Sequence, residues 1–264
     1  MNPEWKARHD LLIRSAQAAG RHALTYYPDV NAARFADQII WKGDSSPVTV
    51  ADREAEAMLR RDLLGAYPDD GFLGEESGET ATKSGFRWVV DPIDGTRSFV
   101  RGIPHWATLA SLEFNGEPIA GVAYEPLLNR TWQALRGQGA FRDDARIQVS
   151  NVEKLENAIM FYSTLNWFVT NERRDGFIEL ARRTQRQRGY GDYYGHLLIA
   201  QGAGEFMIET NVHEWDVSAL KIIVEEAGGR FSNWANEPTT RTPDCISSNG
   251  RIHDLVLETL RGRP

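Results

Sequence analysis

Acidic side chains gather where expected strands end and expected helices begin, positions from which they can hold a divalent cation or act as general acids and bases. One pair stands in a glycine-rich loop after a strand that ends at Phe72-Leu73. A second pair follows the apolar run Trp88-Val89-Val90. Two single aspartates stand at the starts of helices. The six residues are Glu75 and Glu76, Asp91 and Asp94, and Asp52 and Asp216.

The second pair lies in a segment built to bend, Asp91-Pro92-Ile93-Asp94-Gly95-Thr96. Its proline fixes one backbone angle and removes a donor, and its glycine permits a conformation closed to other residues. Such a bend turns both aspartates toward one point and frees the Ile93 carbonyl. Two carboxylates and a carbonyl are hard oxygen ligands, which suit Mg²⁺.

Thr96 is expected to open a helix, whose N-terminal amides favour an anion such as phosphate. The alternative is a surface turn with a helix cap. The buried strand in front of the segment and the other acidic clusters favour a metal site. The spacing of Asp91 and Asp94 is not that of an EF-hand loop.

The other acids also have structural alternatives. Glu75 and Glu76 could be solvated in their loop, and Asp216 could cap its helix. Asp52 has capping-box spacing from Thr49, although capping and catalysis can coexist in one residue.

Other catalytic devices are absent. The chain has no phosphate-binding Gly-x-x-x-x-Gly-Lys loop, and its six histidines show no close ligand spacing. His213-Glu214-Trp215 lacks the second histidine of a zinc-protease helix. The basic run 182–188 is expected to end a helix on a solvated face, with a substrate-phosphate or subunit contact as the alternative.

The first half of the chain predicts two helices followed by strands. Apolar residues recur at helical spacing from Trp5 until Pro28 stops them. A second helix follows Pro47, with five residues expected to face the core. A buried strand, 86–90, is expected to stop abruptly at Asp91-Pro92, and strands 108–114, 119–124 and 130–135 form a meander. The core-facing residues of the second helix are Ala51, Ala55, Met58, Leu59 and Ala66.

The second half alternates helices and strands more evenly. Helices are expected at 171–183, at 215–227 and from about 250, and strands near 203–208 and 245–248. Near Ser150 the pattern changes from mainly strands to alternating helices and strands, and no polar spacer segment separates the two parts. We therefore expect a single domain, 1–264, of the α/β or α+β kind, with two lobes at about 1–150 and 151–264.

Composition excludes several classes of protein. The chain has 264 residues, 30 basic and 37 acidic, for a formal net charge of −7. An acidic balance argues against nucleic acid or an anionic membrane as a partner. The lone Cys245 excludes an internal disulfide and a cysteine-rich zinc site. With no secretory signal and no apolar run of 18 residues, a cytoplasmic globular protein is expected.

The order of these motifs resembles the inositol monophosphatase family. The resemblance rests on Gly74-Glu75-Glu76-Ser77, on Trp88 to Thr96, and on Trp215-Asp216 before Glu226-Ala227-Gly228-Gly229, and it runs from Lys42 to Gly229. It implies a layered α-β-α-β-α sandwich and a lithium-sensitive phosphatase that depends on two or three Mg²⁺ ions. It also implies a homodimer, because relatives commonly form one.

The resemblance further assigns roles. Glu75, Asp91 and the Ile93 carbonyl hold the first metal; Asp91 bridges to a second, completed by Asp94 and Asp216, and Glu75 also touches a third. Of the catalytic residues, Asp52, Thr96 and Glu75, the first two orient the attacking water. The amides of Gly95 and Thr96 hold the phosphate, and Glu209 contacts the alcohol part of the substrate.

Two segments are similar to the histidinol-phosphate phosphatase branch of the family. They are Arg97 to Pro104 and Arg188 to Gly195, and the second contains Asp192 where the inositol branch usually has Thr or Ser. An anionic Asp192 can pair with the ammonium or imidazole of histidinol phosphate; the alternative is a helix cap after Gly191. Rival functions are an inositol-1-phosphate phosphatase, a broader sugar or nucleotide phosphatase, and a catalytically silent phosphate-binding protein.

Overall fold

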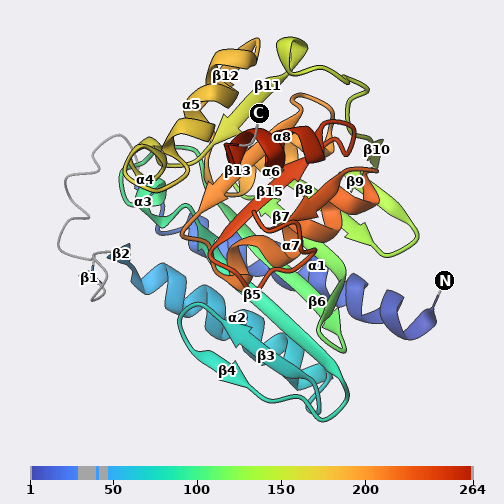
Figure 1. Cartoon of the computed structure of the whole chain (residues 1–264). Helices are drawn as coiled ribbons and strands as arrows, with labels where there is room; N and C mark the ends of the chain where they lie inside the picture. The colour runs from blue at the N-terminus through green and yellow to red at the C-terminus, as the bar shows by residue number, and fades with distance from the viewer. Residues whose placement is uncertain (1, 29–39, 42–46, 263–264) are drawn as a thin grey trace.

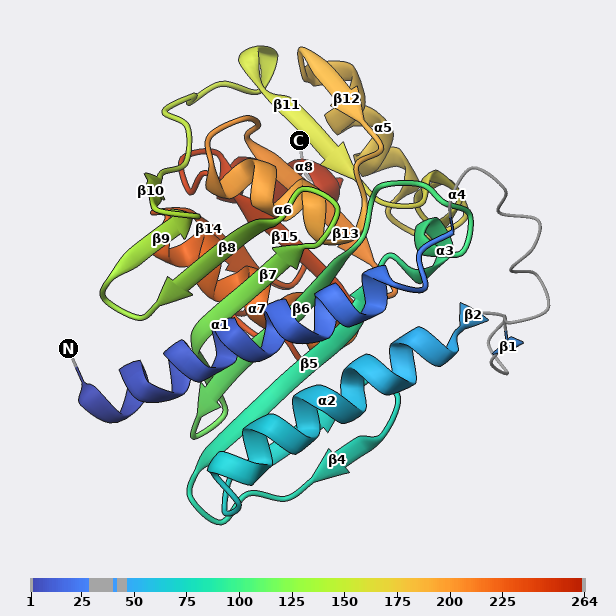
Figure 2. The same ribbon diagram turned by 180° about the vertical axis from the view of Figure 1, so that it is seen from behind.

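Helices and β-sheets alternate in layers through the molecule, shown from opposite sides in Figure 1 and Figure 2. The computed structural model describes residues 2–28, 40–41 and 47–262. Lys42, where the family resemblance begins, lies outside them. Helices α1 (Pro3–Leu24) and α2 (Val50–Ala66) form the first layer, beside a small pair of strands, β1 (Ile40–Trp41) and β2 (Pro47–Val48).

The first two helices confirm the predicted periodicity. The Asn2 side chain caps α1 by accepting from the N–H of Glu4 at 2.9 Å. Thr49 and Asp52 form the predicted capping box of α2. The predicted core face of α2 is right for Ala51, Ala55 and Leu59, which are buried, while Met58 is half-buried. It is wrong for Ala66, which is exposed because the helix ends there and Leu63 fills the core position one turn earlier.

The large sheet forms the second layer and has eight strands in the order β10-β9-β8-β7-β6-β5-β3-β4. Only β3 and β5 run parallel; the other neighbours are antiparallel. The central strands confirm the predicted meander. The strands are β3 (Gly71–Gly74), β4 (Gly78–Thr80), β5 (Phe86–Asp94), β6 (Ala107–Phe114), β7 (Glu117–Glu125), β8 (Arg130–Leu135), β9 (Gly139–Arg142) and β10 (Ala145–Ile147).

Strand β5 does not stop at Asp91-Pro92 as predicted, but continues to Asp94. A bulge accommodates the proline: Asp91 lies opposite Leu109 and Asp94 opposite Ala107, so the register shifts between the two aspartates. Pro92 therefore needs no ladder hydrogen bond of its own, and the strand can pass through it.

Helices α6 (Asp192–Ala200) and α7 (Glu214–Glu226) form the third layer, between the two sheets. The second sheet has the order β12-β11-β13-β15-β14. Its side chains alternate between faces: Met160 and Phe206 pack toward α5 and α8, whereas Phe161 and Met207 pack toward α6. Its strands are β11 (Ile159–Tyr162), β12 (Arg186–Arg188), β13 (Phe206–Thr210), β14 (Arg230–Ser232) and β15 (Asp244–Ser248).

The fifth layer covers the outer face of the second sheet, which confirms the expected α-β-α-β-α order. It comprises α5 (Arg174–Arg183) and α8 (His253–Leu260), with the short α4 (Leu165–Val169) beside α5. A short turn of helix, η2 (Leu155–Asn157), precedes β11. The arginines of the 182–188 run are exposed, as expected. Among the described residues, no helix has the length and apolar composition needed to cross a membrane.

Candidate functional site

Three carboxylates meet where β5 ends and α7 begins. Oxygen atoms of Asp91, Asp94 and Asp216 all lie within 4.8 Å of one another. The β5 bulge turns the first two toward one point, as the sequence of the bend predicted. Asp216 reaches the same point from the first turn of α7, where it also accepts from the N–H of His213 at 2.7 Å. Asp216 therefore caps its helix, as the structural alternative predicted, and also contributes a carboxylate to the cluster.

The electrostatics of this cluster fit a cation. Burial raises the pKa of Asp91 well above its usual value, and the neighbouring charges of Glu75, Asp94 and Asp216 raise it further. Burial likewise raises the pKa of Asp94, with Asp192 as the largest charge contribution. Like charges held this close repel each other unless protons or a cation neutralise them. Because all the side-chain donors are oxygens, Mg²⁺ suits the site better than a soft metal.

Glu75 lies beside the cluster because β3 and β5 run parallel. Their register pairs Gly74 with Val90, so Glu75, the residue after β3, lies beside Asp91, where the bulge of β5 begins. Glu75 is half-buried and is the strongest charge acting on Asp91. Its predicted role as a metal ligand is consistent with this position.

The Ile93 carbonyl is not free, as the bend was expected to leave it. It accepts a hydrogen bond from the Thr96 hydroxyl at 2.9 Å, because that side chain folds back over the bend. A carbonyl oxygen has a second lone pair, so it can still contact a cation.

Asp52 serves its helix and the site at once. One carboxylate oxygen accepts from the N–H of Thr49 at 2.8 Å, which completes the capping box. The other lies 3.3 Å from the hydroxyl of Thr96. Asp52 is fully buried, and burial raises its pKa to about 6. A carboxylate with that pKa can gain or lose a proton near neutral pH.

Gly95 makes the turn into the short helix α3 (Thr96–Phe99), as predicted. Its φ of 88° is in the left-handed region that glycine adopts without strain. A side chain could not fit either, because a Cβ would stand 2.8 Å from the carbonyl oxygen of His105.

The two residues predicted to bind the non-phosphate part of the substrate also lie beside the cluster. Asp192 is the first residue of α6, while Gly191 takes the N-cap position, so the helix-cap alternative for Asp192 is wrong. Burial raises the pKa of Asp192, and the nearby charges of His105 and Arg97 oppose that rise. Glu209, on β13, is buried and accepts from the N–H of Asp192 at 3.2 Å.

Sequence reasoning missed two residues that support the site. His196 lies on the buried face of α6 with its Nε2 2.9 Å from Glu209, and burial lowers its pKa to about 3. Glu56 hydrogen-bonds the loop that carries Glu75. Its spacing of four residues from Asp52 places both on one helix face and could have revealed it.

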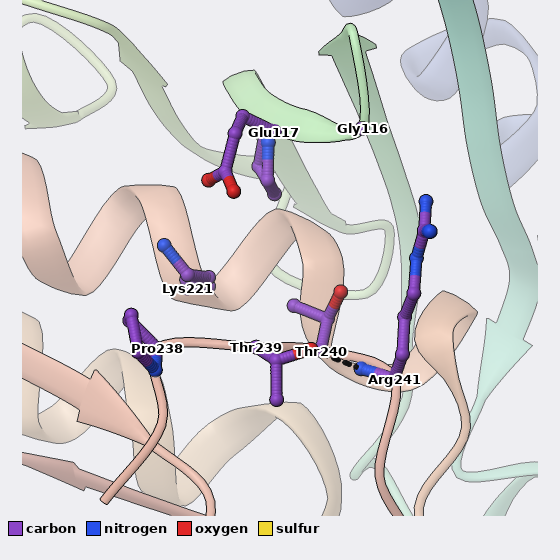
Figure 3. A pocket seen from close by; sticks show the side chains of 8 residues that line it. Gly116, Glu117, Lys221, Pro238, Thr239, Thr240 and Arg241 are labelled. Carbon is purple, nitrogen blue, oxygen red and sulfur yellow. Dashed lines mark hydrogen bonds between the residues drawn. The ribbon is translucent and has the colours of Figure 1, made fainter.

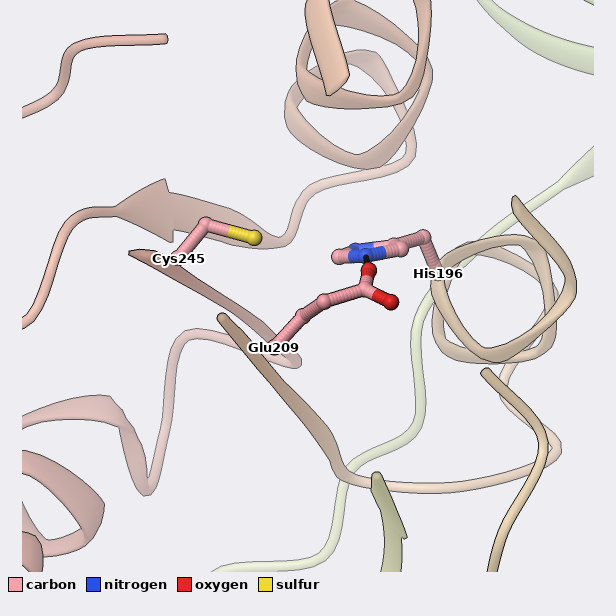
Figure 4. Close-up of side chains that lie close together, drawn as sticks. All are labelled: His196, Glu209 and Cys245. Carbon is pink, nitrogen blue, oxygen red and sulfur yellow. Dashed lines mark hydrogen bonds and ion pairs between the residues drawn. The ribbon is translucent and has the colours of Figure 1, made fainter. Parts of the chain in front are cut away.

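Cys245 joins His196 and Glu209 in a second group, in which the ligand atoms lie within 4.8 Å of one another (Figure 4). Both ring nitrogens of His196 already have hydrogen-bond partners, Glu209 at 2.9 Å and Ser247 at 2.6 Å. The ring nitrogens of His196 are therefore already satisfied by buried hydrogen bonds.

A separate pocket lies between the β6–β7 turn, α7 and the segment before β15 (Figure 3). None of the predicted site residues lines it. The Nζ atom of Lys221, which points into it, already pairs with both carboxylate oxygens of Glu225 at 2.7 and 2.8 Å. The lining residues are Gly116, Glu117, Pro118, Lys221, Pro238, Thr239, Thr240 and Arg241.

Comparison with known proteins decides the family. The model of the inositol monophosphatase family matches residues 7–263. This chain belongs to the inositol monophosphatase family. Members of that family are generally Mg²⁺-dependent, which agrees with the oxygen-rich cluster.

Within the family, similar proteins carry more than one name. The chain is 42% identical over 224 residues to a histidinol-phosphatase of Mycobacterium tuberculosis, covering 83% of this chain and 86% of that one. It is 39% identical to a histidinol-phosphatase of Streptomyces coelicolor, with 84% and 86% covered. A fructose-1,6-bisphosphatase/inositol-1-monophosphatase of Aquifex aeolicus is 30% identical, with 83% and 84% covered.

Solved structures of the family share the whole fold. The extragenic suppressor protein suhB of Bartonella henselae superposes with a TM-score of 0.87 at 30% identity, covering 97% of this chain and 98% of that one. The layered architecture predicted from the motifs is confirmed.

Proposed function

We propose that this family member is a phosphomonoesterase that hydrolyses L-histidinol phosphate to L-histidinol and inorganic phosphate, a step of histidine biosynthesis. The observation that carries the substrate assignment is the position of Asp192, an acid beside the metal cluster at the N-terminal end of α6. The likeness to the histidinol-phosphatases of M. tuberculosis and S. coelicolor supports it.

The predicted ligands fit two or three Mg²⁺ ions. Glu75, Asp91 and the Ile93 carbonyl would hold the first ion, and Asp91, Asp94 and Asp216 would hold the second. Bound Mg²⁺ supplies positive charge that stabilises the attacking and leaving oxygens of an in-line displacement.

Asp52 and Thr96 orient the attacking water. The Thr96 hydroxyl donates to the Ile93 carbonyl at 2.9 Å, which leaves a lone pair on Oγ1 to accept from the water. For the proton to reach Asp52, the single Thr96 hydroxyl hydrogen must turn from the Ile93 carbonyl to the Asp52 oxygen 3.3 Å away. Thr96 then passes that hydrogen to Asp52 as it takes one from the water, and the Asp52 pKa of about 6 suits this uptake near neutral pH.

The remaining residues bind the substrate. The backbone amides of Gly95 and Thr96 hold the phosphate at the start of α3. Asp192 pairs with the ammonium or imidazolium of histidinol phosphate, and Glu209 faces the alcohol part. We further propose that the protein acts in the cytoplasm as a homodimer, with one two-lobed domain per chain.

Phosphate release from histidinol phosphate, measured in Mg²⁺ and again in excess EDTA, tests the proposal. We expect turnover in Mg²⁺ and its loss in EDTA, restored when Mg²⁺ is added back. Tight binding of phosphate esters without turnover would instead indicate the silent phosphate-binding alternative.

A further inference from the structure

Glu56 is a buried acid whose partners are backbone amides of a loop. Its exposed fraction is 2%. One carboxylate oxygen accepts from the N–H of Glu76 and the other from the N–H of Ser77, each at 2.7 Å. Hydrogen bonds to an ionised acceptor are about twice as strong as neutral ones. Glu56 therefore ties the β3–β4 loop to α2, and the two elements lie side by side in Figure 2.

The other end of the same loop fits closely against the Glu56 carboxylate. A Cβ on Gly74 would stand 2.5 Å from the Glu56 carboxyl carbon, so only glycine lets the loop come this near. Glu75 lies between this close contact at Gly74 and the hydrogen bond at Glu76. Its backbone is thus held from both sides by one side chain.

This restraint acts against electrostatic repulsion. Before a cation binds, Glu75 is the strongest charge acting on Asp91, and like charges held this close repel each other. A free loop would relax away from Asp91. A loop tied to α2 cannot, so the free energy needed to gather the ligands is supplied by folding rather than by metal binding.

We propose that Glu56 is a positioning residue for the metal centre, setting the Glu75 backbone so that its carboxylate is ready to bind Mg²⁺ beside Asp91. The proposal rests on the proposed function, in which Glu75 is a metal ligand. Asp52 lies on the same face of α2, one turn before Glu56. The helix therefore also fixes the Asp52–Thr96 pair relative to the β3–β4 loop that carries Glu75.

The test is Mg²⁺ affinity in Glu56→Gln, measured by titration calorimetry. Glutamine keeps the shape but turns an NH₂ group toward one of the two amides. We expect about tenfold weaker Mg²⁺ binding, the lower end of the effect found for residues that orient metal ligands. Hydrogen exchange at Glu76 and Ser77 should also become faster in the metal-free protein. Saturating Mg²⁺ should restore most of the turnover.

The matched control is Glu54→Gln. Glu54 is an exposed acid on the same helix, hydrogen-bonded to His22 and Tyr26, and this change should alter neither the Mg²⁺ affinity nor loop exchange. Wild-type affinity and unchanged loop exchange in Glu56→Gln would overturn the proposal.

Gly74→Ala provides an independent variant should Glu56→Gln fail to fold. Its Cβ pushes the loop off the Glu56 carboxylate, so it too should weaken Mg²⁺ binding about tenfold. Wild-type affinity would overturn the proposal.

Different results would refute the proposed function and the proposed role of Glu56. A wild type that binds Mg²⁺ without hydrolysing phosphate esters would refute the proposed function, whereas the affinity difference between the variants and wild type would still decide the role of Glu56.

Discussion

The backbone N–H of Tyr193 donates to the carboxylate of Asp94 at 2.7 Å, joining two residues that stand 99 positions apart in the chain. This bond attaches the first turn of α6 directly to the strand that carries three of the proposed metal ligands, Asp91, the Ile93 carbonyl and Asp94. Asp192, the preceding residue, is thereby held beside the cluster. The part of the site assigned to the substrate and the part assigned to the metal are thus one connected structure.

Asp192→Asn should weaken binding of histidinol phosphate selectively. The backbone of Asp192 has a φ of 53°, which asparagine tolerates, so the change removes charge with little strain. Loss of a charge-assisted contact costs about 1–3 kcal/mol. It should appear mainly as a higher KM, because the contact is remote from the breaking bond. Steady-state kinetics on histidinol phosphate and inositol-1-phosphate measure it, and the second substrate should change little or improve.

The control for this change is Asp175→Asn, an exposed acid in the first turn of α5. It should leave both substrates unaffected. An equal loss on both substrates in Asp192→Asn would show that Asp192 supports the fold and does not select the substrate.

Asp91→Asn should nearly abolish activity, because this residue is assigned to two metal ions at once. We expect less than a tenth of wild-type turnover, a rise of more than about 1.4 kcal/mol in the barrier. Added Mg²⁺ should raise the Tm of wild type but raise that of the variant much less. Turnover above a tenth of wild type would contradict the bridging role.

The stabilisation by Mg²⁺ should grow with pH. Burial raises the pKa of Asp52, to about 6, and those of Asp91 and Asp94. The metal-free folded state therefore holds more protons than the unfolded chain above about pH 4, and its stability falls as pH rises through these folded-state pKa values. Mg²⁺ must displace the same protons. Thermal unfolding should show a larger Mg²⁺-induced rise in Tm at pH 8 than at pH 5, and equal rises would refute this account.

His196 should contribute the opposite pH dependence. Its folded-state pKa is about 3, below the value of 6.5 for a free histidine, so only the unfolded chain takes up a proton between these values. At pH 5 this costs the native state about 2 kcal/mol relative to neutral pH. In His196→Gln that cost is absent, so denaturant unfolding should show its stability deficit relative to wild type shrinking from pH 7 to pH 5. A constant deficit would mean that His196 is protonated in the fold.

The parts of the site that follow from short segments were predictable. The bend after Asp91 and the left-handed conformation of Gly95 are encoded by neighbouring residues. The meander is predicted by its turn at Asn115-Gly116. The end of β5 was mispredicted, because Pro92 usually breaks a strand and only the register with β6 reveals the bulge.

What could not be predicted depends on contacts between distant segments. Helix α6 was not predicted as an element, although a helix cap after Gly191 was considered. It is short and apolar on nearly all sides, from Leu197 to Ala200, and so lacks an amphipathic pattern. Glu56 was missed because its partners are backbone amides some 20 residues away, so its spacing of four residues from Asp52 was the one signal in the sequence.

The most direct test of the central claim is the ratio of kcat/KM for histidinol phosphate to that for inositol-1-phosphate, measured on the wild-type protein in saturating Mg²⁺. If Asp192 pairs with the cationic end of the substrate, the ratio should exceed about 10, the equivalent of 1.4 kcal/mol of transition-state binding. A ratio below one would contradict the account and assign the protein to the inositol phosphatases of the same family.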